Sequence, residues 1–223
     1  IIPEIEIGDF DRDGNDDIAV MPSSGIGSLS VFYGENGSLI FNTTDIDNFV
    51  NAIGVFDMDN DSFDDEIVIA AYGDVYVYEW NGTVGAQLDG TQYIWHSSAT
   101  LDRSYDVAII DLNGDGYDDV LVGDRESPGY VFALNNSGSY LWNFSTGKSG
   151  TNYIYTINLA DINNDGKKEI LVGDQLAPGT VYVLNHSGDL IWKYEIGLGA
   201  IGGVNGNSPA IDVGDINGDG VID

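Results

Sequence analysis

An acidic loop motif that recurs five times constrains this chain more than any other feature of its sequence. Each copy places Asp or Asn at alternate positions, usually a glycine in the middle, and another acid at the ninth or tenth position. The copies read DFDRDGNDD from Asp9, DMDNDSFDDE from Asp57, DLNGDGYDD from Asp111, DINNDGKKE from Asp161 and DINGDGVID from Asp215. A spacing of about 50 residues is typical of propellers and other repeat arrays, in which each repeat packs on its neighbours.

Each full period also carries the pattern of four short strands. The clearest stretches are GYVFALNNSGSYLWNFSTG from Gly129 and GTVYVLNHSGDLIWKYEIG from Gly179, where alternating apolar residues flank an Asn-x-Ser-Gly turn and predict a hairpin. GSLSVFYGENGSLIFNTT from Gly27 and GDVYVYEWNGTV from Gly73 predict weaker hairpins. With one strand before the loop and one after it, each period supplies the four strands of a propeller blade. We therefore predict an all-β fold, a β-propeller repeat array of four-stranded blades.

We expect one repeat array over residues 1–223, with approximate repeats 1–50, 51–105, 106–155 and 156–209 and the start of a fifth at 210–223. The segment SPAIDVGDINGDGVID duplicates IIPEIEIGDFDRDGNDD, so one copy would be redundant in a closed ring of four blades. Either the chain is part of a larger ring, which we favour, or its terminal segment completes a blade in a neighbouring subunit, because unpaired strand edges invite such addition.

The net charge of −30 is concentrated at the repeated motif. Of the 37 acidic residues 29 are Asp, and 17 of the 37 occupy the alternate and ninth positions of the five loops. Carboxylates so close together repel one another unless a cation lies among them. Only seven Lys and Arg residues are present, which argues against a nucleic-acid partner. No apolar run reaches the roughly 18 residues of a membrane span, so we expect none in the visible chain.

Oxygen ligands without His or Cys favour Ca²⁺, about one ion per loop, which also suits a flexible loop. The side-chain ligands expected are Asp9, Asp11, Asp13, Asp17, Asp57, Asp59, Asp61, Asp65, Asp111, Asn113, Asp115, Asp119, Asp161, Asn163, Asp165, Glu169, Asp215, Asn217, Asp219 and Asp223. The backbone carbonyls expected to contribute are those of Asn15, Phe63, Tyr117, Lys167 and Val221. Asx turns without metal are the alternative, which five copies in one register make less attractive.

The second loop departs from this pattern. Ser62 replaces the glycine, and an additional acid, Glu66, leaves open whether Asp65 or Glu66 is the last ligand. An EF-hand is not expected in any copy, because the hydrophobic runs DIAV, DVLV and EILV are β-rich and too short for the flanking helix that an EF-hand requires.

Seven Asn-x-Ser/Thr sequons add a second signal. We predict N-glycosylation at Asn36, Asn42, Asn81, Asn135, Asn143 and Asn185, and exclude Asn60 because it lies inside a metal loop. Turn chemistry alone is the alternative, but it explains Asn42 and Asn143 poorly, since both follow the aromatic residue of a hairpin's second strand. Sequons and calcium loops, which need millimolar Ca²⁺, together predict an extracellular or cell-surface location.

The D-x-D-x-D-G-x-x-D loop leading into a strand resembles the FG-GAP or VCBS repeats of integrin-α-type β-propellers, over essentially the whole chain. The resemblance implies that the loops bind Ca²⁺ within a blade and brace the propeller. The LNxSGxxxW hairpins with Trp142 and Trp192 also resemble, more weakly, the repeats of PQQ-type propellers. We expect these two tryptophans to pack between blades rather than to form a cofactor site.

No catalytic constellation is recognisable around His96 or His186, and the chain has no Cys. A polysaccharide lyase built on a calcium-binding propeller would need a basic cluster, whereas the Lys and Arg residues are dispersed along the sequence. We therefore expect a non-enzymatic, calcium-stabilised extracellular module for adhesion, recognition or surface assembly, with a protein or glycan ligand or copies of itself as partner. A structural subunit of an extracellular fibre is the alternative, and a non-catalytic or catalytic part of a polysaccharide-acting enzyme such as a lyase is a minor alternative.

Overall fold

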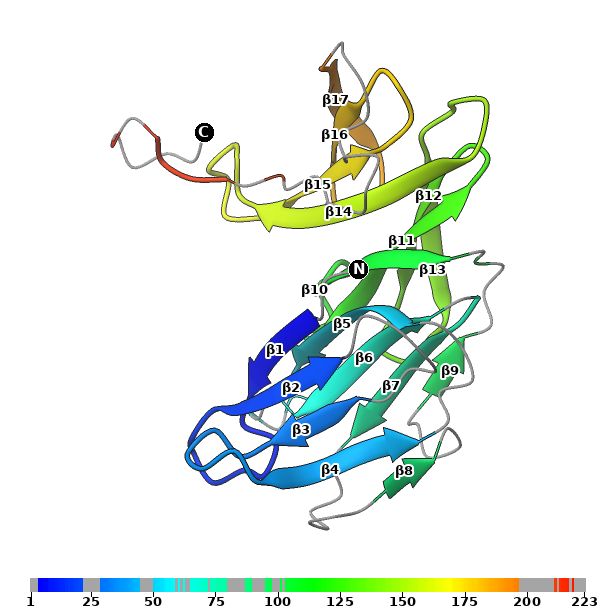
Figure 1. The fold of residues 1–223 in the computed structure, drawn as a ribbon. Coiled ribbons are helices and arrows are strands. Elements are labelled where there is room, and N and C mark those ends of the chain that lie inside the picture. The colour runs from blue at the N-terminus through cyan, green and yellow to red at the C-terminus, as the bar shows by residue number, and fades with distance from the viewer. Residues whose placement is uncertain are drawn as a thin grey trace.

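The computed structural model is all-β over the residues that it describes (Figure 1). These residues are 4–21, 29–44, 50–58, 60, 62, 65–71, 73–79, 87–89, 95–97, 101, 103–196, 211, 213–216 and 218. All elements formed by these residues are strands, and the described part of the chain has no helix that could cross a membrane. The predicted all-β fold is therefore confirmed.

The first half of the chain forms two antiparallel sheets. The first contains β1 (Glu4–Gly8), β2 (Asp17–Met21), β3 (Ser30–Phe32) and β4 (Leu39–Thr44), and β8 (Gln87–Asp89) extends it by pairing parallel to β4. The second contains β5 (Val50–Phe56), β6 (Glu66–Ala71), β7 (Val75–Glu79) and β9 (Trp95–Ser97). Each is a set of four neighbouring antiparallel strands, as expected of a blade.

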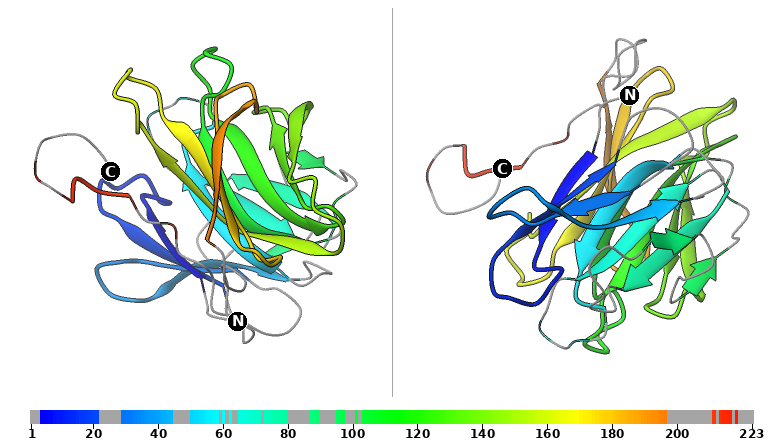
Figure 2. Two further views of the ribbon diagram at one scale, coloured as in Figure 1. Left: turned by 90° about the horizontal axis from the view of Figure 1, so that it is seen from above. Right: turned by 60° about the horizontal axis from the view of Figure 1, so that its bottom comes forward.

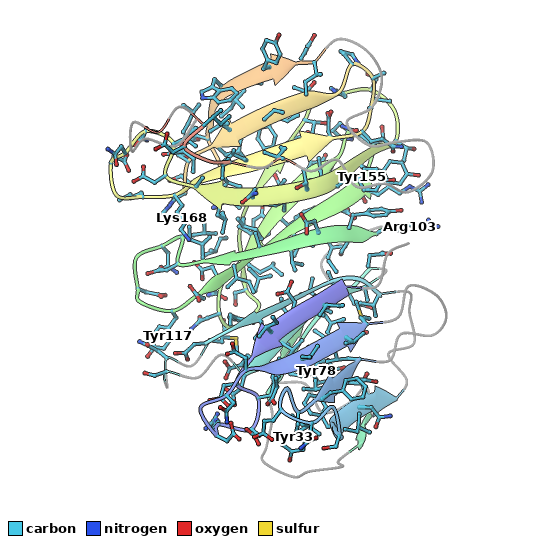
Figure 3. The ribbon with its side chains drawn as sticks, turned by 60° about the vertical axis from the view of Figure 1, so that its left-hand side comes forward. Tyr33, Tyr78, Arg103, Tyr117, Tyr155 and Lys168 are labelled. Atoms are coloured by element: carbon cyan, nitrogen blue, oxygen red, sulfur yellow. The ribbon has the colours of Figure 1, made fainter. Side chains whose placement is uncertain are left out.

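The second half repeats the arrangement. The third sheet contains β10 (Ser104–Ile110), β11 (Asp119–Glu126), β12 (Tyr130–Leu134) and β13 (Tyr140–Ser145), and the fourth contains β14 (Asn152–Ala160), β15 (Glu169–Asp174), β16 (Thr180–Leu184) and β17 (Leu190–Glu195). A short pairing of β11 with β14 joins these two sheets. Figure 3 shows the sheets stacked in chain order from blue to orange.

Three of the four predicted hairpins are confirmed: β3 with β4, β12 with β13 and β16 with β17. The hairpin predicted from GDVYVYEWNGTV is wrong, because β7 pairs with β9, which follows only after residues 80–94. The residues directly after Asn81 and Gly82 in the sequence are small. In the observed pairing, Trp95 of β9 lies opposite Val77, in the same register in which Trp142 lies opposite Ala133 in the third blade. The blade therefore takes its fourth strand from further along the chain.

The core lies between consecutive sheets. Neighbouring residues on successive strands of a blade form a row that faces the next blade in the first three blades. The rows of the first three blades are Ala19–Val31–Phe41, Val68–Val77 and Leu121–Ala133–Trp142. The corresponding row of the fourth blade is Leu171–Val183–Trp192, where Leu171 and Val183 pack with Ile211 and Val213. Leu121 and Ala133, for example, pack in one cluster with Ile157, Ile170 and Val172 of the fourth sheet. Central strands such as β6 and β15 are buried along their whole length because both of their faces are covered.

A buried carboxylate connects three strands of the fourth sheet at the end opposite its acidic loop. Asp174 is completely buried and accepts hydrogen bonds from the Asn152 side chain, the Tyr182 hydroxyl and the Thr180 backbone. The ammonium group of Lys148, which lies in the connection between the third and fourth sheets, is 2.7 Å from Asp174 Oδ2 and also donates to the Leu176 carbonyl. The charge of Asp174 is thus paired and hydrogen-bonded, which a fully buried carboxylate requires.

We predict that Lys148→Met lowers the free energy of unfolding by about 3 kcal/mol, because it leaves the buried Asp174 carboxylate without its cation. Urea denaturation monitored by tryptophan fluorescence measures the change. Lys193→Met, at an exposed position of β17, is the matched control and should have almost no effect. Equal effects of the two substitutions would show that the Lys148–Asp174 pair does not stabilise the fold.

Candidate metal centre

The acidic loops connect the first and second strands of each blade. β1, β5, β10 and β14 each end just before a loop, and β2, β6, β11 and β15 begin just after it. Tyr117 and Lys168, in the third and fourth loops, lie on one side of the stack, and Tyr155 and Arg103 lie on the opposite side (Figure 3). The antiparallel topology therefore brings repeated loops to the same edge of successive sheets.

The first aspartate of each loop accepts hydrogen bonds from backbone N–H groups further along the same loop. Asp9 accepts from the amides of Asp13 and Gly14 at 3.0 and 2.8 Å, and Asp161 accepts from the equivalent amides of Asp165 and Gly166 at 3.0 and 2.8 Å. Asp111 accepts from Gly114 and Gly116, Asp57 from Ser62 and Asp215 from Gly218. These contacts curl the chain around the first carboxylate.

The alternate positions add further Asx turns. Asn163 accepts from the amide of Asp165, and Asp165 accepts from that of Lys167. The same two contacts occur in the third loop, from Asp115 to Asn113 and from Tyr117 to Asp115. The turn chemistry that was the alternative to a metal is therefore present. It does not compete with a metal, because each carboxylate has further lone pairs.

Two positions of the loop adopt the left-handed backbone conformation. At the sixth position φ is +89° in Gly14, +88° in Gly116 and +86° in Gly166, and Ser62 adopts +76° despite its side chain. At the fourth position φ is positive in Arg12, Asn60, Gly114, Asn164 and Gly218. The recurring glycine marks the sixth position in the sequence, and Gly and Asn, which tolerate this conformation best, recur at the fourth position as well.

The carboxylate at the end of the loop closes it. Asp119 accepts a hydrogen bond from the Leu112 amide at 3.0 Å, and Glu169 accepts one from the Ile162 amide at 3.0 Å. In the second loop the equivalent bond, from the Met58 amide at 2.9 Å, goes to Glu66. Glu66, rather than Asp65, therefore occupies the closing position, because the second loop is one residue longer.

Asp65 instead makes a contact between loops. Its Oδ2 accepts a hydrogen bond from Arg12 Nε of the first loop at 2.7 Å, and the Asp65 side chain is completely buried whereas that of Arg12 is 35% exposed. Arg12 occupies the fourth position of its loop with a positive φ. The other four loops have glycine or asparagine at this position. The sequence offered one signal for this pair, a lone basic residue inside an acidic motif.

Three carboxylates converge in the first loop. Oxygens of Asp9, Asp11 and Asp17 all lie within 4.8 Å of one another, and within the part of the chain that the structure describes this is the one such group of three. Asp17 is almost fully buried, its Oδ1 accepts from the Gly34 amide, and its Oδ2 has no hydrogen-bond partner. Asp13 lies outside this group, and its Oδ1 accepts from both nitrogens of Asn15.

The pKa values of the loop carboxylates reflect this crowding. Burial raises the pKa of Asp17, with repulsion from Asp11 and Asp13 adding to it, and burial and repulsion likewise raise the pKa of Asp11. Burial also raises the pKa of Asp119, whose Oδ1 is buried without a hydrogen-bond partner. In contrast, the Asn15 amide lowers the pKa of the exposed Asp13. An orphaned, buried oxygen at the closing position of two loops fits a site for a hard cation such as Ca²⁺.

Several predicted ligands lie outside the described residues. They are Asp59, Asp61, Phe63, Asn217, Asp219, Val221 and Asp223. In the fourth loop Asn163 donates to Glu169 Oε1 at 2.6 Å, so the third and ninth side chains of that loop are in contact.

The predicted glycosylation sites differ in their surroundings. Asn135 and Asn185 lie in hairpin turns, where their Oδ1 atoms accept hydrogen bonds from the amides of Ser137 and Ser187. Asn36 and Asn143 are exposed, and Asn42 is half-buried in β4. Asn81 lies outside the described residues. His186 is half-buried in a hairpin turn beside the fourth loop, with Nε2 2.8 Å from the Lys168 carbonyl oxygen.

The chain is similar to known repeat proteins. A family model described as FG-GAP-like repeat matches residues 57–122, 111–172 and 161–223. No curated protein matches the chain. Among solved structures, a Bacteroides caccae protein of unknown function is 14% identical with a TM-score of 0.51, over 82% of this chain and 59% of its own. The computationally designed protein Ika8 is 15% identical with a TM-score of 0.56, over 88% and 60%.

A third similar structure is the Vibrio cholerae biofilm matrix protein Bap1, which is 16% identical with a TM-score of 0.43, over 86% of this chain and 39% of its own. This chain thus spans less than two thirds of each of these three structures. The first two similarities show the fold alone, and that fold is the repeat array expected from the sequence.

We predict that Arg12→Gln lowers the free energy of unfolding by about 2 kcal/mol, because it removes the cation from the buried Asp65; the value is below that of a fully buried pair since Arg12 is partly exposed. Urea denaturation of Arg12→Gln, Asp65→Asn and the double variant forms a double-mutant cycle. The double variant should lose clearly less stability than the sum of the single variants. Additive losses would contradict an interaction across the two loops.

Proposed function

The chain belongs to the family of FG-GAP-like repeats, and on that premise we propose that it is an extracellular, calcium-stabilised β-propeller module that recognises a protein or glycan ligand rather than catalysing a reaction. The match covers residues 57–223, three quarters of the chain. Repeats of this family are typical of extracellular proteins and generally take part in protein interactions.

The observation that carries calcium binding is the environment of Asp17. Its buried Oδ2 has no hydrogen-bond partner and lies in a group with Asp9 and Asp11. Without a cation, this arrangement combines the desolvation of one carboxylate with the repulsion of two others, which is unfavourable on both counts. Asp9, Asp11 and Asp17 would hold the ion in the first loop, and Asp119 would contribute its orphaned oxygen in the third.

A calcium ion in such a loop would stabilise the blade. The closing carboxylate belongs to the second strand, since Asp17, Glu66, Asp119 and Glu169 are the first residues of β2, β6, β11 and β15. The first aspartate follows the end of the first strand of the same blade. An ion shared by the two would therefore hold the first and second strands together at the edge where the loop leaves the sheet.

Two sequence features support the extracellular location. Calcium sites in extracellular modules work at the millimolar concentrations found outside cells. The exposed Asn36 and Asn143 are sequons that a glycosyltransferase could reach, and we propose that both are glycosylated. Assembly into a surface fibre is the second candidate function, favoured by the dense sequons and the repeat design of the chain.

Removal of calcium should lower the melting temperature sharply. With free Ca²⁺ at about a hundred times the dissociation constant, each occupied loop adds about 2.7 kcal/mol to the free energy of unfolding. Thermal melts in 1 mM CaCl₂, 1 mM MgCl₂ and EGTA measure the shift, and native mass spectrometry counts the ions. Magnesium should restore much less stability, because it requires near-ideal octahedral geometry. A melt that does not respond to EGTA would exclude a bracing role for calcium.

Glu66→Gln and Asp65→Asn should differ in how they depend on calcium. Glu66 closes the second loop, so Glu66→Gln should reduce the calcium-induced rise in melting temperature and have a smaller effect in EGTA. Asp65 pairs with Arg12, so Asp65→Asn should destabilise the protein in both buffers. The same pair of melts tests both variants. If Asp65→Asn removed more of the calcium response than Glu66→Gln, the assignment of the closing position would be wrong.

A further inference from the structure

A group of tyrosine and arginine side chains lies at the joint of the third and fourth blades. The rings of Tyr153 and Tyr155 on β14 are stacked, with centroids 5.3 Å apart and planes 10° from parallel. The Tyr105 ring of β10 meets both of them edge-on, with centroid distances of 5.2 and 4.9 Å. Arg125 of β11 holds its guanidinium 5.1 Å from the centre of the Tyr153 ring. Three strands from two blades thus bring aromatic rings and a cation together.

The backbone explains why these side chains meet. Tyr105 and Tyr155 each occupy the β-bulge in the first strand of a blade, six residues before the first loop aspartate. A bulge changes the direction of the side chain that it carries. Across the joint, Arg125 lies directly opposite Tyr153 in the short pairing of β11 with β14. Asn51 holds the same bulge in the second blade, so the group of rings is particular to this joint and is not a property of every repeat.

A second arginine lies in the same place. Arg103 takes the position in the third blade that Tyr153 takes in the fourth, eight residues before the first loop aspartate. Its carbonyl accepts a hydrogen bond from the Arg125 amide at 2.9 Å, so the two arginines are backbone neighbours although they are separated in the sequence. Two of the seven basic residues of the chain therefore gather here. We call Arg103, Tyr105, Arg125, Tyr153 and Tyr155 the Tyr–Arg cluster.

The Tyr–Arg cluster stands apart from the acidic loops. Each of its five residues is half-buried, so each retains accessible surface. Arg103 and Tyr155 lie at the end of the sheets opposite Tyr117 and Lys168 of the acidic loops (Figure 3). Figure 2 shows the third sheet, in green, beside the fourth, in yellow and orange, and β14 pairs with β11 at their joint. The cluster is thus formed by two adjacent blades that are both present.

The carboxylates next to Arg125 in the sequence do not share its face of the strand. Side chains alternate along a strand, so Asp124 and Glu126 project from the opposite face of β11. Asp124 is completely buried, and its Oδ1 accepts a hydrogen bond from the Arg103 amide at 2.8 Å. Arg125 therefore supplies a positive charge on the side of the strand where the tyrosine rings lie, in a chain whose net charge is −30.

These groups together match a sugar that carries a carboxylate. A guanidinium is a planar fork of N–H donors that fits both oxygens of a carboxylate. The negative faces of aromatic rings attract the weakly positive C–H groups of a pyranose ring. Burial raises the pKa of Tyr155 to about 12, with Tyr105 and Tyr153 adding to it, so its hydroxyl is uncharged at neutral pH and does not repel an anion.

We propose that the Tyr–Arg cluster binds a uronic acid residue of an acidic glycan, with the carboxylate on the arginines and the pyranose ring on the tyrosines. The inference rests on the function proposed above, because it names the ligand class and the site of a module that recognises a ligand. Charge complementarity selects this occupant, since the acidic loops at the opposite edge would repel the same sugar. A neutral sugar would gain nothing from the arginine charges, and a basic ligand would be repelled by them.

Saturation-transfer difference NMR on the full chain in CaCl₂ buffer tests the proposal. Methyl β-glucuronide carries both the pyranose ring and the carboxylate, and it should bind with a Kd of about 1 mM, as expected for so small a ligand. Methyl β-glucoside lacks the carboxylate and should bind about tenfold more weakly. Transfer should be largest at the C–H protons of the pyranose ring, and binding of the glucuronide alone should weaken as the salt concentration rises.

Variants separate the roles of the charge and the rings. Arg125→Gln should weaken glucuronide binding about tenfold, to the level of the glucoside, and leave glucoside binding unchanged. Tyr153→Leu should weaken both ligands, because both use the ring. Lys193→Gln and Tyr140→Leu, at exposed positions of β17 and β13 outside the cluster, are the matched controls and should change neither. Circular dichroism melts establish that each variant is folded.

Three results would overturn the proposal. Glucuronide binding that Arg125→Gln leaves unchanged would place the sugar elsewhere, and glycan recognition by the module would stand. No transfer to either glycoside at about ten times the expected Kd would exclude this ligand class, whereas the calcium melts would still decide separately whether the module is calcium-stabilised. Tighter binding of tetraglutamate than of the glucuronide would assign the cluster to an acidic protein segment instead.

Discussion

The structure depends on the burial of both faces of every blade against its neighbours. A four-stranded sheet of this size cannot be stable alone, because its central strands are apolar on both sides, as β6 and β15 are along their whole length. Rows such as Leu121–Ala133–Trp142 supply one face, and the first strand of the next blade supplies residues such as Ile157 for the other. Each repeat is therefore completed by the repeat that follows it.

The acidic loops are a consequence of the same arrangement. Because the first two strands of every blade run antiparallel, they meet in a loop at one edge of the stack, and the last side chain of that loop belongs to a buried strand. Asp17 and Asp119 are buried for this reason, and each retains an oxygen without a hydrogen-bond partner. The Asx turns give the loop its shape without metal, and a cation would relieve the desolvation and repulsion that remain.

The sequence by itself determined the repeat, its strands and the family, because a motif present five times carries far more information than any single loop and strand alternation is a local property. It also located the hairpins at 135–139 and 185–189, where Asn, Ser and Gly form the turn through their own hydrogen bonds. Only the tertiary structure decided that β7 pairs with β9, that Glu66 closes the second loop, that Arg12 reaches Asp65 and that Lys148 neutralises Asp174. The β7–β9 pairing and the Arg12 and Lys148 contacts depend on which segments distant in sequence become neighbours, and the Glu66 contact depends on how a loop with one additional residue folds. The repeat pattern does not encode such contacts, because each is unique to one copy.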